Sequence, residues 1–314
     1  MLLTIGLLIL GLVLLYFGAE GLVNGASSLA LRLGITPLIV GLTVVSFGTS
    51  APELLVCLLG TNDVSVGNII GSNIANLALI LGAAAMVRPI EVHARVVARE
   101  FPVMVAASLL FILLAIDGTL SRYDGIILLM GMAGYLIYTY FQAKKDMEAL
   151  AALVGDGLDE VDVAKASPMA DVAKLVLGIV GLAGGAKLMV DSAVEIAQHF
   201  GISELVIGIS IVAIGTSLPE LATSLVASYR NQSDISVGNV VGSNIFNIFL
   251  VLGVVAVVSD LTLSGDALGI DLWVMLAVSI GIWPLLRTGH RLHRWEGFLL
   301  IAVYIAYMVS LFLR

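Results

Sequence analysis

The sequence is poor in charged residues, in cysteine and in histidine. Only 12 % of its 314 residues are charged and 60 % are hydrophobic, whereas soluble globular domains carry roughly 25 % charged residues. With a mean hydropathy of +1.09, the chain is predicted to be an integral membrane protein. The single cysteine, Cys57, excludes an intrachain disulfide and is interpreted as a small packing residue. The net charge of −8 argues against a nucleic-acid partner.

Ten apolar runs are long enough to cross a bilayer, for which about 20 residues suffice. The first run has no Lys or Arg before its apolar core, so it is interpreted as a span and not as a secretory signal. The sequence therefore predicts an all-α membrane protein with ten transmembrane helices. The spans are expected at roughly 2–17, 36–59, 66–87, 101–116, 123–141, 169–190, 203–228, 236–258, 268–286 and 296–313.

Basic residues alternate between the connections, which predicts the orientation. One set of connections contains only Arg122, apart from the terminal Arg314. Because basic connections stay on the cytoplasmic side, both chain ends are expected outside. The basic connections contain Arg32; Arg88, Arg95 and Arg99; Lys144, Lys145 and Lys165; Arg230; and Arg287, Arg291 and Arg294.

The chain contains one pattern twice. GITPLIVGLTVVSFGTSAPELLVCLL, from Gly34, aligns with GISELVIGISIVAIGTSLPELATSLV, from Gly201; VSVGNIIGSNIANLALILG, from Val64, aligns with ISVGNVVGSNIFNIFLVLG, from Ile235. Low complexity does not reproduce matched Gly, Pro, Ser, Asn and Glu positions. Five spans, an odd number, separate the copies, so the halves are expected to form two inverted-topology five-helix repeats, as in many secondary transporters.

The repeats predict three regions of the chain. Residues 1–142 form the first repeat, with its motif region at about 36–87, and residues 169–314 form the second, with its motif region at about 203–258. Residues 143–168 are interpreted as a cytoplasmic linker. This linker is acidic, but it lacks the EF-hand pattern D-x-[DN]-x-[DN]-G, so a calcium-binding loop is not favoured.

GTSAPE at 48–53 and GTSLPE at 215–220 each put a glutamate beside a proline in an apolar run. A charge in a lone membrane helix costs about 2.5–3.5 kcal/mol, so Glu53 and Glu220 are expected to face each other or a water-filled cavity. Each proline is expected to break its helix and free a carbonyl. The hydroxyls of Thr49, Ser50, Thr216 and Ser217 lie three or four residues before a glutamate and so share its helical face.

GSNIAN and GSNIFN add a serine and an asparagine four residues apart in each half, Ser72 with Asn76 and Ser243 with Asn247. Carboxylates, amides, hydroxyls and carbonyls are ligands of hard cations such as calcium, whereas zinc or copper would require His or Cys. The four histidines lie in connections or near span ends. Two glutamates neutralise one divalent cation, and the same oxygens could accept sodium ions or protons, which allows exchange.

These paired motifs resemble the alpha-repeats of the calcium/cation antiporter superfamily, and nearly the whole chain resembles its prokaryotic sodium/calcium exchanger-like members. The resemblance implies a cytoplasmic-membrane antiporter that alternates access as its first and sixth helices slide over a fixed core. It implies calcium and sodium as transported ions, no cofactor and no obligatory protein partner. The implied ligands are Glu53, Glu220, Thr49, Ser50, Thr216, Ser217, Ser72, Asn76, Ser243 and Asn247, with backbone carbonyls of Ser46, Thr49, Ala213 and Thr216.

One residue departs from the family pattern, and the sequence leaves other functions to consider. Several relatives, including potassium-dependent ones, have an aspartate where this chain has Asn247, which weakens the case for potassium co-transport. A proton/calcium antiporter is the nearest alternative, because a buried carboxyl group can carry a proton. A passive cation channel is a further alternative, although two inverted copies in one chain favour a carrier. An enzyme is not expected, because no nucleophile–base pair or His-rich metal site is found.

Overall fold

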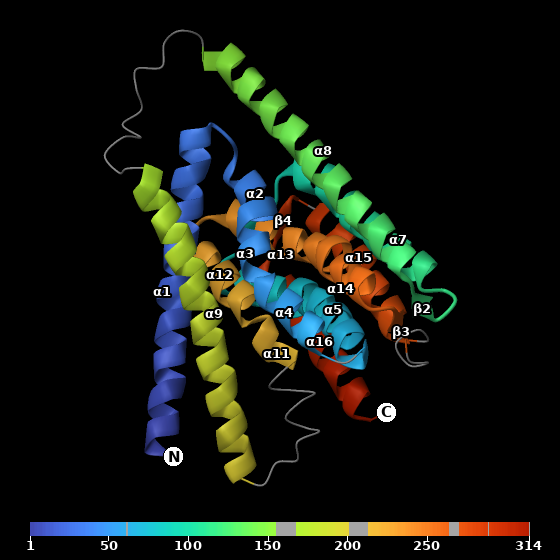
Figure 1. Cartoon of the computed structure of the whole chain (residues 1–314). Coiled ribbons are helices and arrows are strands. Elements are labelled where there is room, and N and C mark those ends of the chain that lie inside the picture. Colours follow the sequence, from blue (N-terminus) through green and yellow to red (C-terminus); the bar gives the residue numbers. More distant parts are fainter. Residues whose placement is uncertain (61, 155–167, 201–212, 264–269, 288, 314) are drawn as a thin grey trace.

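The computed structural model describes residues 1–60, 62–154, 168–200, 213–263, 270–287 and 289–313 (Figure 1). Helices make up nearly all of them. The first half of the chain contains α1 (Leu2–Leu33), α2 (Pro37–Val40), the π-helical turn η1 (Gly41–Val45), α3 (Ser46–Thr49), α4 (Ala51–Leu59), α5 (Asn62–Ile74), η2 (Ala75–Ile80), α6 (Leu81–Val87), β1 (Ile90–Glu91), η3 (Val96–Glu100), α7 (Phe101–Leu114), β2 (Thr119–Leu120) and α8 (Arg122–Val154).

The second half repeats this order of elements. It contains α9 (Pro168–His199), α11 (Ala213–Thr216), α12 (Leu218–Tyr229), α13 (Ser233–Phe246), η6 (Asn247–Leu252), α14 (Gly253–Val258), β3 (Leu261–Thr262), α15 (Leu272–Arg287), β4 (Arg291–Leu292) and α16 (Arg294–Phe312). The predicted linker 143–168 begins inside α8, and its residues 155–167 lie outside the described part of the chain.

Eight helical segments of the described residues are long and apolar enough to cross a membrane, and α15 is a shorter apolar helix. The predicted span at 203–228 is described only from Ala213, so ten crossings remain a prediction. The first predicted span, 2–17, was too short. α1 has 32 residues and ends at Gly34, a left-handed cap with φ 65°, so at 1.5 Å per residue it is about 48 Å long.

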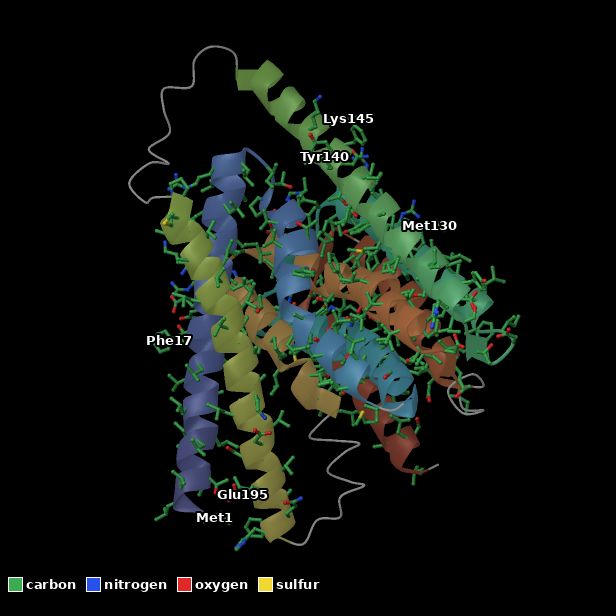
Figure 2. The ribbon with its side chains drawn as sticks, viewed as in Figure 1. Met1, Phe17, Met130, Tyr140, Lys145 and Glu195 are labelled. Carbon is green, nitrogen blue, oxygen red and sulfur yellow. The ribbon has the colours of Figure 1, made fainter. Side chains whose placement is uncertain are left out.

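The outer surface supports a membrane-embedded molecule. Phe17, Met130 and Tyr140 point away from the helices (Figure 2) and are each more than half exposed, as suits side chains that contact lipid. Met1 and Glu195 lie at one end of the molecule, and Lys145 lies at the other (Figure 2). The chain therefore folds as an all-helical membrane protein.

Two short antiparallel ribbons relate the halves to each other. β1 pairs with β4, and β2 pairs with β3. Because β1 precedes α7 and β4 follows α15, while β2 follows α7 and β3 precedes α15, these two helices must run in opposite directions. They occupy equivalent places in the two halves and contact each other. Opposite direction of equivalent helices is the relation that an inverted repeat requires.

α1 and α9 form a long pair beside the other helices (Figure 1). Their backbones approach closely at glycines: a Cβ on Gly18 would lie 2.7 Å from the Leu182 nitrogen, and a Cβ on Gly178 would lie 2.6 Å from the Leu22 nitrogen. Polar contacts join the pair near both ends. Arg32 Nε donates to an Asp171 carboxylate oxygen at 2.5 Å, and Thr4 Oγ1 donates to Glu195 Oε1 at 2.7 Å.

Candidate functional site

The proline motifs interrupt their helices, as predicted. α3 ends before Ser50, where φ is −83° and ψ is 0°, and α11 ends before Ser217, where φ is −90° and ψ is 5°. These dihedrals lie in the sparsely populated bridge region of backbone conformation. α4 and α12 restart with Pro52 and Pro219 in their first turns. At each break, a serine hydroxyl and the glutamate carboxylate three residues later therefore lie at the start of the second helix.

Glu53 and Glu220 lie in the first turns of α4 and α12 and are both 0 % exposed. Ser50, three residues before Glu53, donates its hydroxyl to Glu220, so the two helix N-termini bring their carboxylates to the same region. Both Glu53 carboxylate oxygens and Glu220 Oε2 have no hydrogen-bond partner among the described residues. A helix N-terminus stabilises negative charge, but two buried carboxylates still call for a cation or for protons. The predicted pair is therefore brought together.

Hydroxyl groups from both halves meet beside the glutamates. Ser50 Oγ donates to Glu220 Oε1 at 3.2 Å, and Ser243 Oγ donates to the same oxygen at 3.5 Å. Thr49 Oγ1 lies 3.4 Å from Ser243 Oγ. The group thus combines residues from α3, α12 and α13, which come from opposite repeats.

A second contact between hydroxyls repeats this arrangement. Ser217 Oγ donates to Ser72 Oγ at 3.3 Å, so the break after α11 meets α5 of the first half, as the break after α3 meets α13 of the second. Both serines are buried. Neither half of the chain forms this cluster of hydroxyls by itself, so the candidate site requires both repeats.

Asn76 and Asn247 lie in the first residues of the π-helical turns η2 and η6 and are fully buried. Asn76 Nδ2 donates to Asn244 Oδ1 at 3.0 Å. Asn76 Oδ1 and both polar atoms of the Asn247 amide have no partner in the described part of the chain. π-Helical turns inside α-helices often occur at functional sites. The sequence pattern did not predict these turns.

Three predicted residues lie differently from the others. Ser46 Oγ donates to the Gly41 carbonyl at 2.8 Å, while its own carbonyl accepts from the Ser50 N–H at 2.9 Å. Thr216 Oγ1 donates to Asn68 Oδ1 at 2.9 Å. Ala213 begins α11, and only its backbone is described.

Sequence reasoning missed two asparagines. Asn239 Oδ1 accepts a hydrogen bond from Thr49 Oγ1 at 3.0 Å, and Asn68 Oδ1 accepts the equivalent bond from Thr216. Both asparagines belong to the repeated segments VSVGN and ISVGN. Their matched positions in the two copies were the signal that could have found them.

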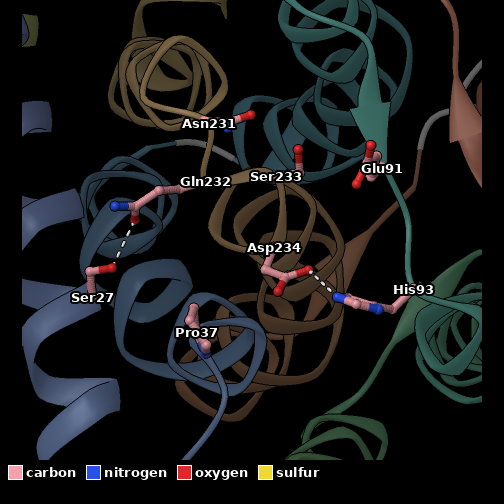
Figure 3. Close-up of a pocket in the computed structure, with 8 residues that line it drawn as sticks. All are labelled: Ser27, Pro37, Glu91, His93, Asn231, Gln232, Ser233 and Asp234. Carbon is pink, nitrogen blue, oxygen red and sulfur yellow. Dashed lines mark hydrogen bonds and ion pairs between the residues drawn. The ribbon is translucent and has the colours of Figure 1, made fainter. Parts of the chain in front are cut away.

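A pocket of about 330 Å³ lies away from this site, at the N-terminal end of α13 (Figure 3). His93 Nε2 lies 3.3 Å from Asp234 Oδ1, and Ser27 Oγ donates to Gln232 Oε1 at 3.0 Å. Among the described residues that line the pocket there is none of the predicted ligands. Asp234 precedes Ser243 by nine residues, which is about 14 Å along a helix. Among the described residues, no three His, Cys, Asp or Glu side chains gather to hold a metal ion.

Two buried carboxylates, one of which accepts hydrogen bonds from serines of both repeats, inside an all-helical membrane fold, are typical of a membrane protein that transports cations. The family model described as sodium/calcium exchanger protein matches residues 3–143 and 171–313. The chain belongs to this family of membrane cation/calcium exchangers.

Individual relatives match over nearly the full length. The putative antiporter CaxA of Alkalimonas amylolytica is 40 % identical over 97 % of each chain. The inner membrane protein YrbG of Escherichia coli strain K12 is 41 % identical, covering 99 % of this chain and 98 % of its own. A solved structure of the sodium-calcium exchanger NCX_Mj, soaked with zero Na⁺ and Ca²⁺, matches with a TM-score of 0.83, 33 % identity and 99 % coverage of each chain.

Proposed function

We propose that this protein is a secondary active antiporter that exchanges calcium for sodium across a prokaryotic cytoplasmic membrane by alternating access. The observation that carries the proposal is the pair of buried carboxylates, Glu53 and Glu220, with serine hydroxyls from both repeats donating to Glu220. The similarity to NCX_Mj supports sodium and calcium as the ions, and the similarity to YrbG supports the membrane.

Ion binding is proposed for the whole set of buried oxygen donors. The two glutamates supply the charge that balances one calcium ion, and hydroxyls, amides and carbonyls complete the 6–8 oxygens that calcium prefers. The unpartnered oxygens of Glu53, Glu220, Asn76 and Asn247 support this role. The remaining proposed ligands are Thr49, Ser50, Thr216, Ser217, Ser72 and Ser243 and the carbonyls of Ser46 and Ala213.

Sodium and calcium compete for overlapping oxygens in this mechanism. When either ion is bound, most of the charge of the carboxylates is balanced and the site can close. A site with unbalanced carboxylates cannot close, because burying an unpaired charge costs free energy. Access alternates as α1 and α9 move along the other helices. We further propose ten crossings, an inverted second repeat in residues 169–314 and both chain ends outside.

Calcium flux in everted membrane vesicles tests the counter-ion. The protein is expected to accumulate ⁴⁵Ca²⁺ under an imposed sodium gradient and not under an imposed pH gradient of equal size. Flux driven only by the pH gradient would instead establish a proton/calcium antiporter, which the unpartnered carboxylate oxygens also permit. Flux that needs no counter-ion would establish a channel.

A further inference from the structure

The two threonines of the candidate site each give their hydroxyl proton to an asparagine of the opposite repeat. Thr49 Oγ1 donates to Asn239 Oδ1 at 3.0 Å, and Thr216 Oγ1 donates to Asn68 Oδ1 at 2.9 Å. Longer contacts surround Thr49, to the Ser46 carbonyl and to Ser243 Oγ, both at 3.4 Å. Since a hydroxyl has one proton, that proton is assigned to the shortest of these contacts, the one to Asn239.

The asparagine amides are held in place from their other side. Asn239 Nδ2 donates to Ser224 Oγ at 3.0 Å and to the Glu220 carbonyl at 3.3 Å. Asn68 Nδ2 donates to Cys57 Sγ at 3.4 Å. Cys57 and Ser224 occupy equivalent positions in the two copies. In both repeats the amide nitrogen therefore faces its own half, and the amide oxygen faces the threonine of the other half.

The direction of this proton matters to a cation. A threonine oxygen binds a cation through its lone pairs, and a proton turned toward the cation would oppose it. With the Thr49 proton directed at Asn239, the lone pairs of Thr49 Oγ1 remain available on the side of Ser243 and Glu220. Ser243 Oγ in turn donates to Glu220 Oε1 at 3.5 Å. The hydroxyl oxygens are thus prepared for a cation before it arrives.

We propose that Asn68 and Asn239 are positioning residues of the ion site, each fixing the hydroxyl of a threonine from the opposite repeat so that its oxygen faces the cation. This inference rests on the proposed function, because it assigns a task within the same site. It does not make the asparagines ligands. Removal of either amide should weaken ion binding only as long as the partner threonine keeps its hydroxyl.

A double-mutant cycle tests this dependence. Equilibrium ⁴⁵Ca²⁺ binding is measured on the purified full-length protein in detergent, for the wild type, Asn239→Ala, Thr49→Val and the double variant. Each single change is expected to weaken calcium binding about tenfold, and the double variant should be within about twofold of Thr49→Val, because residues that act through one another are not additive. Effects that multiply to about a hundredfold, or unaltered binding by Asn239→Ala, would overturn the proposal.

Two further sets of variants separate positioning from general damage. Asn73, also buried on the helices of the site, donates to Met275 Sδ at 3.6 Å. Asn73→Ala and Thr49→Val should therefore show independent effects, and coupling as large as that of Asn239 would count against the proposal. If Asn239→Ala does not fold, the cycle of Asn68→Ala with Thr216→Val gives the same decision, because Asn68 accepts the equivalent bond from Thr216 and its amide nitrogen contacts only the softer Cys57 thiol among the described residues.

The outcome also separates this proposal from the exchange function. Coupled binding together with calcium flux that ignores sodium would overturn sodium exchange and leave the positioning role standing. Sodium-dependent flux together with multiplying effects in both cycles would overturn the positioning role and leave sodium exchange standing.

Discussion

The α1/α9 pair is packed differently from the two central helical segments, Val64–Val87 and Ser233–Val258. In each helix of the pair, 28 % of the most apolar 18-residue stretch is buried in the protein, against 78 % in Val64–Val87 and 83 % in Ser233–Val258. The central helices carry the hydroxyls and amides of the candidate site. The pair instead presents most of its surface outward and joins its two backbones through glycines.

This difference is compatible with the proposed movement of α1 and α9 as one unit. The backbones of α1 and α9 approach closely at glycines, and closely packed interiors resist deformation. Against the central helices the pair makes a smaller apolar cluster, which includes Val226, Ala227 and Ile235. Two polar contacts cross the same boundary, Arg230 with Glu20 and Ser27 with Gln232. Movement of the whole pair would preserve the seam and change the contacts at this boundary.

The largest expected effect concerns the central site. Glu53→Gln and Glu220→Gln should each reduce sodium-dependent calcium flux in vesicles by more than about a hundredfold, since even residues that only support a metal ligand cost 10–100-fold. Glu100→Gln is the matched control, because Glu100 is a buried acid of η3 outside the site. It should keep most of its flux. Equal flux in wild type and either site variant would remove the two glutamates from the mechanism.

The seam between α1 and α9 gives the next largest effect. Gly18→Ala puts a Cβ within 2.7–3.0 Å of the α9 backbone, and backbone cannot give way as a side chain can, so a destabilisation of about 1–3 kcal/mol is expected. Thermal unfolding in detergent should show a lower midpoint, and flux should fall several-fold. Gly184→Ala is the control on α9, where no heavy atom of the described residues lies within 4 Å of the added carbon. If both variants unfold alike, the seam is not a close backbone contact.

The sequence was sufficient for the parts of this comparison that depend on local chemistry. The cost of a carboxylate in an apolar run predicted that Glu53 and Glu220 would face each other or a water-filled cavity, and the lost N–H of proline predicted broken helices, which the structure has at Ser50 and Ser217. The π-helical turns and the threonine–asparagine bonds could not be predicted, because they depend on how the two halves pack. Hydropathy also ended the first span at 17, since it registers Glu20 as a boundary while the helix continues to Leu33.

Glu20 lies beyond the predicted end of the first span. It lies inside α1 and forms an ion pair with Arg230, which follows α12, whereas its equivalent Lys187 binds Asp191 one turn along the same helix α9 at 2.9 Å. The first contact therefore links the pair to the central helices, and the second does not.

Removing the Glu20–Arg230 contact should give the smallest effect. A partly exposed ion pair contributes about 0–1 kcal/mol, so Glu20→Gln should change the balance of the two access states by up to about fivefold. The change would be read as the ratio of apparent calcium affinities in right-side-out and everted vesicles. Lys187→Gln, which breaks a contact within one helix, should leave this ratio unaltered. The exchanged pair Glu20→Arg with Arg230→Glu should restore it; if the ratio moves equally in the control, the contact does not bias the position of the pair.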